Sequence, residues 1–392
     1  MAVAPTDTDV RLQASIADIP SAGWERLLPD VPDTRGYYLA VEKAPPPNFA
    51  FGAVSASDGD DLVAVAPTFT LDYRLDTSLQ GPLHRTLAGL SERWPGLASA
   101  KVIAIGSPLL DNLTLGFAPS LGAFQRQQIF GSFLETMEAE AGRTRCQIIV
   151  AKSLDESQAD LLHDTLTAHG YRRIRALPTV VVDLPFETFD AYLMSLSKKR
   201  RSNYRQKMRS LTGVRFERRS SVGGLEGDLY RLFEATRTRS RGQYNEFDKL
   251  HPHYFSELSA QLGERLQVLL FWKDAELVGM LTLLVGKTAI IARDFGMKYP
   301  LGRELNLYFL AFLETIRFAI DRRIATLDMG ATTYETKLQF GGRLDRKWLY
   351  LKFRRPLANR LLGPLAPLFD FERNDPELVR LAAIETPPAD RR

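Results

Sequence analysis

Apolar residues recur along this chain with two different periods, and the alternation of the two predicts an α/β fold. Spacing of three to four residues, which places side chains on one face of a helix, marks residues 125–141 and 305–320 as amphipathic helices. Runs that alternate or stay apolar, such as residues 62–71 and 277–285, are typical of strands. Both halves of the chain mix the two patterns, so each half predicts a sheet flanked by helices.

The pattern of the first half is complete near Pro185, which predicts a domain boundary there. A length of 392 residues exceeds one typical hydrophobic core and agrees with more than one domain. We therefore expect an N-terminal domain over residues 1–185, a C-terminal domain over 186–370 with a basic helix at 198–211, and a tail at 371–392. The two halves share an order of elements, which suggests an internal duplication, although no sequence repeat is visible.

Each domain is expected to be α/β (α+β), with a mixed, mostly antiparallel sheet flanked by helices. Residues 180–182 are predicted as a central strand of the first sheet, and residues 289–292 as a central strand of the second. Ser21 and Ser197 stand at predicted helix starts, where a hydroxyl accepts a hydrogen bond from a free backbone N–H. A further helix is predicted at residues 82–94.

The composition is that of a soluble globular protein, with 45% apolar residues, 25% charged residues and a net charge of +4. This mildly basic balance does not by itself imply nucleic acid. The single cysteine, Cys146, excludes an intramolecular disulfide and a cysteine-based metal cluster, and no common metal or nucleotide-binding motif occurs. Without such motifs we expect no bound metal. The chain start lacks a signal-peptide pattern and no apolar run reaches the roughly 18 residues that span a bilayer, so we expect a cytoplasmic protein.

A dense basic run covers residues 198–209, where every charged side chain is a cation. Acidic partners three or four residues away normally relieve such repulsion, and the run contains none. A solvated helix face, a phosphate-binding surface and a nucleic-acid patch are all compatible with it, and we favour a bound polyanion, either a phosphorylated cofactor or the end of an RNA. Arg201 and Arg205 lie one turn apart and are predicted to bind one anion together.

Residues 299–352 carry the densest set of candidate functional residues. A Pro-Leu-Gly turn opens a helix there, and the free N–H groups of a helix start suit an anionic phosphate. Gly302 would allow close approach of a ligand to the backbone, and Arg303 follows it. An ordinary loop that binds nothing is the competing interpretation.

Polar residues also flank the neighbouring strand and turn. Asp294, next to Arg293, interrupts an otherwise apolar strand, and charges in such a strand either pair with neighbours or face a cleft. A turn of small residues is flanked by Asp328 on one side and by Tyr334, Glu335 and Lys337 on the other, an arrangement that allows the four side chains to converge. A salt bridge that only stabilises the fold explains the same carboxylate and lysine equally well.

Segments of the second half resemble the FemAB-like, GNAT-related acyltransferases. The segments are LSKKRRSNYRQKMRSL, ARDFGMKYPLG, LNLYFLAFLETIRFAIDRR and LDMGATTYETKLQFGGRLDRKW. The resemblance covers residues 186–353 and implies two GNAT-like domains, the second of which binds an acyl donor. Most GNAT relatives use an acyl-CoA thioester, and the Fem relatives use aminoacyl-tRNA. Where GNAT proteins have a glycine-rich phosphate loop, this chain has MKYPLGREL, with one usable glycine.

The resemblance implies an N-acyltransferase that moves an acyl group from acyl-CoA, a cosubstrate rather than a tightly bound cofactor, to an amine of a small-molecule acceptor by direct attack. The candidate catalytic residues are Asp294, Tyr334, Glu335 and Lys337. The candidate donor-binding residues are Arg201, Arg205, Phe295, Met297, Gly302 and Arg303. In this scheme Asp294 or Glu335 is the base, Tyr334 protonates the leaving group, and backbone N–H groups around Phe295 polarise the carbonyl.

Two alternatives stay open on the sequence. An aminoacyl-tRNA-dependent transferase of the Fem type would use the basic run for RNA. A GNAT-like protein that binds a ligand without catalysis would explain the missing glycine loop, whereas the clustered polar residues favour an enzyme. The sequence predicts neither the acceptor, nor the acyl chain, nor the oligomeric state.

Overall fold

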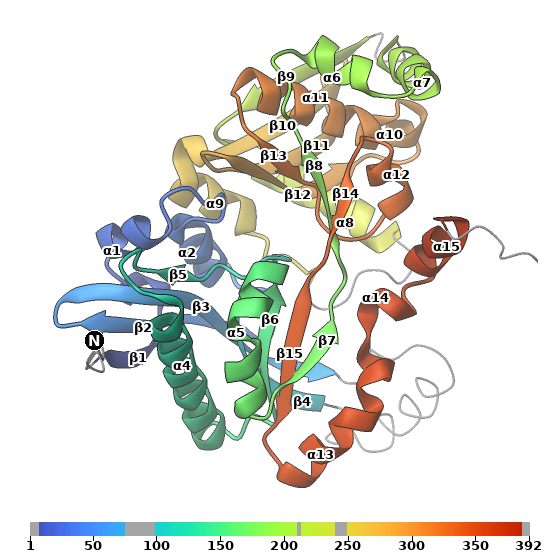
Figure 1. The fold of residues 1–392 in the computed structure, drawn as a ribbon. Coiled ribbons are helices and arrows are strands. Elements are labelled where there is room, and N and C mark those ends of the chain that lie inside the picture. Colours follow the sequence, from blue (N-terminus) through green and yellow to red (C-terminus); the bar gives the residue numbers. More distant parts are fainter. Residues whose placement is uncertain (1–7, 75–98, 210–212, 240–248, 386–392) are drawn as a thin grey trace, which may run out of the picture. The chain divides into compact units, whose positions relative to one another are not determined.

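The structure, a computed structural model, describes residues 8–74, 99–209, 213–239 and 249–385 of the chain. The chain forms two compact units, each with its own sheet and covering helices (Figure 1). Unit 1 comprises Met1–Pro29, Asn48–Pro178 and Asp345–Arg392, and unit 2 comprises Asp30–Pro47 and Thr179–Leu344. The helix predicted at residues 82–94 lies outside the described residues.

Unit 1 is built on an eight-stranded sheet. Its strands are β1 (Asp9–Gln13), β2 (Phe49–Asp58), β3 (Asp61–Arg74), β4 (Ser99–Ile105), β5 (Gly116–Phe117), β6 (Ile148–Leu154), β7 (Arg172–Arg175) and β15 (Trp348–Phe353). They lie in the order β1-β2-β3-β4-β6-β15-β7, with the short β5 paired to β3. β4 and β6 run parallel, and the other neighbours are antiparallel.

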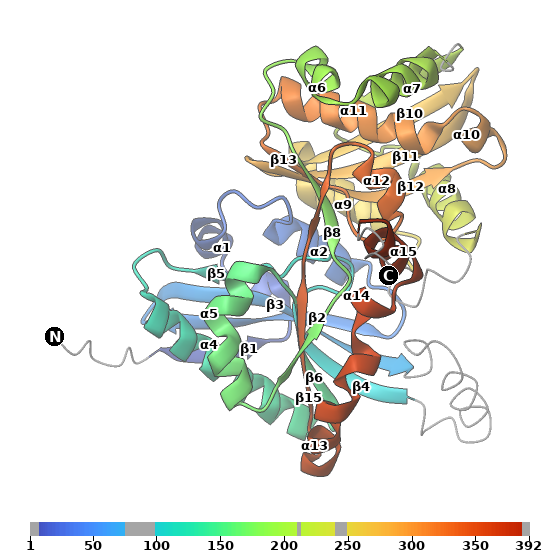
Figure 2. The same cartoon turned by 45° about the vertical axis from the view of Figure 1, so that its right-hand side comes forward.

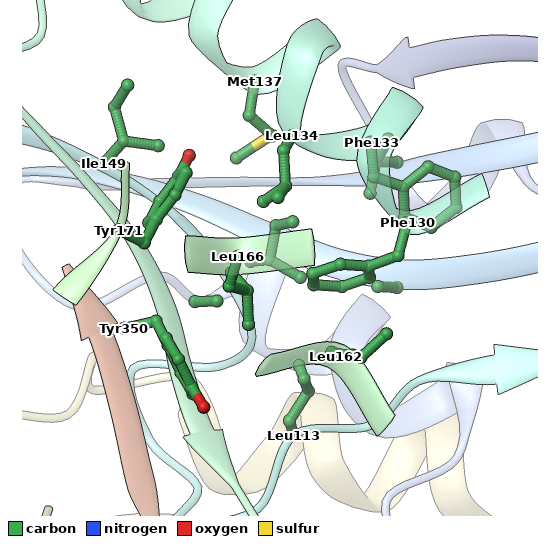
Figure 3. Close-up of a cluster of buried hydrophobic side chains, with 14 of the residues drawn as sticks. Leu113, Phe130, Phe133, Leu134, Met137, Ile149, Leu162, Leu166, Tyr171 and Tyr350 are labelled. Atoms are coloured by element: carbon green, nitrogen blue, oxygen red, sulfur yellow. The ribbon is translucent and has the colours of Figure 1, made fainter. Parts of the chain in front are cut away.

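Helices α4 (Ala123–Arg143) and α5 (Glu156–Ala168) lie side by side against this sheet (Figure 2). Figure 3 shows Phe130, Leu134 and Met137 of α4 pointing into the core of the unit. The amphipathic helix predicted at residues 125–141 is therefore confirmed. Ser21 is the first residue of α1 and not its cap, a position that Pro20 holds. Other helices of unit 1 include α1 (Ser21–Leu27), α13 (Pro356–Leu365), α14 (Phe371–Asn374) and α15 (Pro376–Glu385).

Unit 2 is built on a seven-stranded sheet in the order β14-β8-β13-β12-β11-β10-β9. Its strands are β8 (Thr179–Asp183), β9 (Val214–Arg219), β10 (Leu266–Lys273), β11 (Glu276–Val285), β12 (Ala289–Met297), β13 (Thr326–Asp328) and β14 (Arg343–Asp345). Its helices include α2 (Arg35–Lys43), α6 (Phe189–Ser195), α7 (Lys198–Arg209), α8 (Glu226–Arg239), α9 (Tyr254–Leu262), α10 (Leu301–Glu304), α11 (Leu307–Asp321) and α12 (Tyr334–Leu338). In the described ranges of both units, no helix combines the length and apolar character needed to cross a bilayer.

The two sheets follow one plan. In each, four antiparallel strands lead to a fifth that runs parallel to the fourth, and a sixth lies antiparallel to the fifth. The parallel pair is β4 and β6 in unit 1, and β12 and β13 in unit 2. A helical crossover joins each pair, as parallel strands require. The shared order of elements and the two mixed, mostly antiparallel sheets that were expected are therefore present.

The sixth strand of each sheet, β15 in unit 1 and β8 in unit 2, comes from a distant part of the chain. Residues 176–178 separate β7 from β8, yet β7 belongs to the sheet of unit 1 and β8 to the sheet of unit 2. The prediction that residues 180–182 lie in the first sheet is wrong, because β8 pairs with β13. The prediction for residues 289–292 is confirmed, because β12 lies between β11 and β13.

The units also differ from the contiguous domains expected on either side of residue 185. Residues 30–47 belong to unit 2, and Asp345–Arg392 belongs to unit 1, where β15 lies between β6 and β7. An apolar strand satisfies either sheet, so its sequence position does not decide which one it joins.

Candidate functional site

In unit 2, strand β12 extends beyond its pairing with β13. The two strands are paired along residues 289–291 and 326–328, whereas β12 continues to Met297. After Ile291, the side of β12 that faced β13 therefore has no partner strand in the described sheet. Such an edge presents backbone N–H and C=O groups that a ligand can use.

The equivalent strands of unit 1 do not separate in this way. Ile105, the last residue of β4, is still paired with Ala151 of β6. The loop after β4 then covers the end of β6, because Leu113 N–H donates to Ser153 O at 2.9 Å. Of the two related sheets, the one in unit 2 therefore offers the open strand edge.

A β-bulge lies on β12 just past the last pairing with β13. The register between β11 and β12 shifts so that Thr282 faces both Arg293 and Asp294. The Asp294 N–H donates to Thr282 Oγ1 at 2.9 Å, and this hydroxyl donates to Asp294 Oδ2 at 2.8 Å. The bulge interrupts the backbone hydrogen bonds between β11 and β12, and the threonine side chain replaces them. Thr282 and Asp294 together fix the shape of β12 at this point.

Asp294 is almost fully buried, with 1% of its surface exposed. Tyr254 Oη donates to its Oδ2 at 3.2 Å, and Arg293 Nε lies 3.7 Å from its Oδ1. Burial raises the pKa of the Asp294 carboxyl, and Arg293, Thr282 and Tyr254 oppose that rise. A raised pKa suits a base, but the burial separates this carboxylate from an acceptor in solution. Its direct partners are Arg293, Tyr254 and Thr282.

The residues after Asp294 contact helices on opposite faces of the sheet. Gly296 lies against the α8 backbone, where an added Cβ would come within 2.6 Å of Leu232 C. The Phe295 ring meets Tyr308 of α11 edge to face, with centroids 5.0 Å apart. α8 and α11 therefore hold the free part of β12 between them.

The two predicted backbone donors on β12 differ in their partners. The Met297 N–H donates to Thr236 Oγ1 of α8 at 3.0 Å. Successive N–H groups of a strand alternate in direction, so the Phe295 N–H points the same way as that of Met297. The strand edge at Phe295 is the one that β13 has left. Phe295 is therefore the better placed of the two donors.

Gly302 and Arg303 lie in α10, directly after β12. The Gly302 N–H donates to Lys298 O at 2.7 Å, and a Cβ on Gly302 would lie 2.7 Å from Met297 Sδ. Gly302 thus allows α10 to pack on Met297. The guanidinium groups of Arg303 and Arg239 lie over the Tyr299 ring, 5.3 and 4.8 Å from its centroid. These two arginines bring positive charge together at the end of β12.

A constrained loop follows β13 and leads into α12. Thr332 and Thr333 have positive φ values of 63° and 53°, which β-branched residues rarely adopt. The buried Lys337 Nζ donates to Gly330 O at 3.1 Å and to Ala331 O at 2.7 Å. Lys337 therefore holds the loop in this conformation.

The other two candidates of this segment differ in exposure. Tyr334 is fully buried, whereas Glu335 is exposed on α12. Glu335 is therefore the carboxylate of this segment that a dissolved acceptor can reach. The described contacts do not join Glu335 to Asp294.

The basic run forms α7, and Ser197 caps it, since its Oγ accepts from Arg200 N–H at 3.3 Å. Tyr204 is buried and its Oη donates to Gln339 O at 2.6 Å, which fixes the helix on the segment after α12. Arg201 Nη1 donates to Met194 O and Leu196 O at 2.9 and 2.5 Å, whereas Arg205 is exposed. The two arginines predicted to bind one anion together therefore differ in their surroundings, because Arg201 is hydrogen-bonded to the end of α6.

The sequence reasoning missed Thr282 and Tyr254, whose hydroxyls both donate to Asp294. A threonine inside the apolar run MLTLLV was the available signal for Thr282. Tyr254 is distant in sequence and follows helical spacing like an ordinary core residue. Among the described residues, no group of three or more His, Cys, Asp or Glu side chains is placed to hold a metal ion.

Comparisons with known proteins address the same region. Residues 198–338 match the model of the family described as acetyltransferase (GNAT) domain. Two curated relatives, both described as putative 8-amino-7-oxononanoate synthase 2 of Mycobacterium tuberculosis, are 24% identical over 199 residues. The match covers 50% of this chain and 26% of each relative, so the chain spans about a quarter of their length.

Two solved structures share the fold of nearly the whole chain. The crystal structure of FemX has a TM-score of 0.59 at 11% identity, covering 91% of this chain and 100% of that one. The C-terminal domain of a putative lysylphosphatidylglycerol synthetase from Agrobacterium fabrum has a TM-score of 0.52 at 13% identity, covering 90% and 97%. The chain therefore shares the fold of FemX over nearly its whole length, and its residues 198–338 match the acetyltransferase (GNAT) domain.

Proposed function

We propose that unit 2 is an N-acyltransferase that moves an acyl group from a CoA thioester to the amine of a small-molecule acceptor. The observation that carries this proposal is the free edge of β12 beside the bulge at Asp294. It supplies an N–H group at Phe295 that is oriented before any substrate arrives, which suits a carbonyl oxygen that gains negative charge.

In the proposed reaction the neutral amine nitrogen attacks the thioester carbonyl carbon directly. The C–N bond forms, the C–S bond breaks, the amine proton leaves to water, and the thiolate takes a proton from solvent. The Phe295 N–H polarises the carbonyl, and the bulge fixes its direction. No covalent intermediate on the protein is required.

The remaining candidates take supporting roles in this proposal. Arg303 and Arg239 bind the phosphates of the donor, because they place two guanidinium groups at the end of β12. Glu335 binds the acceptor as its ammonium form, which loses one proton to water before the neutral amine attacks. Tyr334 and Lys337 are buried and shape the loop before α12 without touching the reactants. Pools of acyl-CoA are cytoplasmic, so the proposal places the protein in the cytoplasm.

The test of this proposal is a panel of acyl-CoA thioesters, first by thermal shift and then by release of free CoA thiol with a panel of amines. A donor at 100 times its dissociation constant should add about 2.7 kcal/mol to the stability of the folded protein. Amine-dependent thiol release with one of these donors supports the transferase. Stabilisation without release by any amine would instead favour a protein that binds the donor without catalysis, and no stabilisation would contradict the choice of CoA.

An aminoacyl-tRNA donor is the second candidate, favoured by α7. Lys198, Lys199 and Arg205 are exposed, and no ion pair of theirs is found among the residues described. Phosphate contacts by such cations release counterions, so binding of RNA would fall steeply with salt.

Replacing Lys198, Lys199 and Arg205 together by alanine tests this second candidate with total tRNA as the probe. If α7 binds RNA, the slope of log affinity against log salt should fall by about 0.7–0.9 for each lost contact. The matched control replaces Arg355, Arg360 and Arg380, exposed cations of unit 1, and removes the same charge. Equal losses in both variants would show a general charge effect and exclude α7 as an RNA site.

A further inference from the structure

Helix α13 carries two exposed leucines on one face. The helix follows β15 at one end of the sheet of unit 1 (Figure 1). Leu357 and Leu361 have 74% and 61% of their surface exposed, and their spacing of four residues places them on the same side of the helix. Single exposed leucines are common on protein surfaces, whereas two on successive turns of one short helix form an apolar stripe.

The opposite side of α13 fixes the helix to unit 1. Leu362 is buried, with 1% of its surface exposed. The Asn359 side chain accepts from Phe353 N–H at 3.0 Å and donates to Gly170 O at 2.9 Å. Because these contacts hold one side of the helix against the unit, the leucine stripe is held on the outer side.

Exposed arginines flank the leucine stripe. Arg355 directly precedes α13, and Arg360 lies next to Leu361 on its outer side. Residues 346–369 contain no acidic side chain, and no ion pair of either arginine is found within the described ranges. We call Leu357, Leu361, Arg355 and Arg360 the α13 face. It is apolar along its middle and positively charged at its edge.

A neighbouring segment adds positive charge to the same end of unit 1. Arg354 Nε donates to Cys146 O at 2.9 Å, so the residues around Cys146 lie beside the start of α13. Arg145 in this segment is exposed. Glu140, at the end of α4, is paired with Arg143 at 2.7 Å. The segment therefore strengthens the positive charge near the α13 face.

The chemistry of the α13 face favours one kind of partner. An RNA would pair with the arginines but would leave the leucines against a phosphate backbone. A second copy of this chain that docked through the same face would place arginines against arginines. An anionic lipid surface matches both features, because its phosphates attract arginine and the boundary of its acyl chains accepts leucine.

We propose that the α13 face docks this protein on an anionic lipid surface, where Leu357 and Leu361 insert between headgroups and Arg355 and Arg360 bind the headgroup phosphates. The association is peripheral and reversible, since two leucines bury far less apolar area than a lipid anchor does. The inference does not depend on the proposed function, because binding to vesicles requires neither an acyl donor nor an amine.

The experiment is sedimentation of the full-length chain with vesicles. One set contains equal parts of phosphatidylglycerol and phosphatidylcholine, and the other contains phosphatidylcholine alone. We expect binding to the anionic vesicles that weakens as salt screens the charges, and much weaker binding to phosphatidylcholine. Absent binding to the anionic vesicles would overturn the proposal.

Two double variants separate the apolar and the charged contributions. Leu357→Gln with Leu361→Gln keeps good helix-forming residues and should lower partitioning onto anionic vesicles by about tenfold for each leucine. Arg355→Gln with Arg360→Gln should lower it by about fivefold for each cation and should reduce its salt dependence. Unchanged partitioning of either variant would overturn the proposed docking face.

Matched controls remove the same kinds of side chain elsewhere. Phe124→Gln with Val379→Gln replaces two apolar side chains that are 70% and 52% exposed. Lys43→Gln with Arg380→Gln removes two exposed cations. Both controls should bind vesicles like the wild type, and all four variants should keep its Tm because the altered side chains are exposed. Losses in the controls equal to those in the α13 variants would show a general surface effect and overturn the proposal.

The oligomeric state provides an independent check on the partner. Sedimentation of the chain without vesicles measures whether it forms dimers at rising concentration. Dimers that dissociate on Leu357→Gln with Leu361→Gln, in a protein that does not bind anionic vesicles, would assign the α13 face to a second copy and overturn the lipid proposal. A chain that binds the vesicles through this face and stays in the same oligomeric state in both forms supports it.

Discussion

Thr282→Val should destabilise the folded protein by about 2–4 kcal/mol, because it removes a donor and an acceptor from a buried site. The Thr282 hydroxyl accepts from Asp294 N–H and donates to Asp294 Oδ2, and the residue has no exposed surface. Valine has nearly the shape of threonine, so the loss reports the hydrogen bonds rather than the packing. Chemical denaturation of the full-length chain measures it.

Thr282→Val should also lower kcat, and by more than a loss of packing alone would. The bulge sets the direction of the Phe295 N–H. Loss of a group that donates a hydrogen bond to the reacting carbonyl oxygen typically reduces kcat by about a hundredfold. Thr282→Ser is the matched control, since it keeps both hydrogen bonds and loses one methyl group, at about 1 kcal/mol. Equal destabilisation by valine and serine would show that the hydroxyl does not support the bulge.

The sequence was sufficient for the elements and for the general type of fold. The helical spacing in residues 305–320 and the apolar meander that contains β11 are strong local patterns, and both elements are present. The likeness of the second half to GNAT-related proteins agrees with the family match at residues 198–338. These features depend on short-range spacing, which sequence reasoning handles well.

The strand exchange could not be predicted in the same way. TVVVD is an apolar strand in either sheet, and the choice of β13 as its partner depends on long-range packing. The same limit applies to the site. Asp294 was identified because a charge in an apolar strand is conspicuous, whereas Tyr254 looks like a core residue until α9 brings its hydroxyl to Asp294.

Burial also altered the roles that the sequence suggested. The prediction of Asp294 as a direct base assumed access to the acceptor, and the structure shows 1% exposure. The prediction of Gly302 as a site of close ligand approach did not anticipate Met297, which lies where a side chain would be. A sequence gives residue types and spacing, but it does not say which surface a neighbour already covers.

The ionisation of Asp294 should be visible in the stability of the protein. Burial raises its pKa above the ordinary value of 3.8, so the folded state binds this proton more tightly than the unfolded chain. Its contribution to stability is therefore complete below pH 3.8 and is lost as the pH rises through the folded pKa. Asp294→Asn lacks this titration, so its free energy of unfolding relative to that of the wild type should increase as the pH rises from 3.8 through the folded pKa.

Kinetics should distinguish the two carboxylates of the proposed site. Asp294→Asn should lower kcat by about 10–100-fold with little change in acceptor KM, because it disturbs the group that fixes β12 in the transition state. Glu335→Gln should raise the acceptor KM about tenfold with kcat nearly unchanged, since an exposed carboxylate binds an ammonium mainly in the ground state. Glu304→Gln removes another exposed carboxylate, on α10, and should change neither constant. The reverse pattern would exchange the two roles, and normal kinetics in both variants would place both residues outside the site.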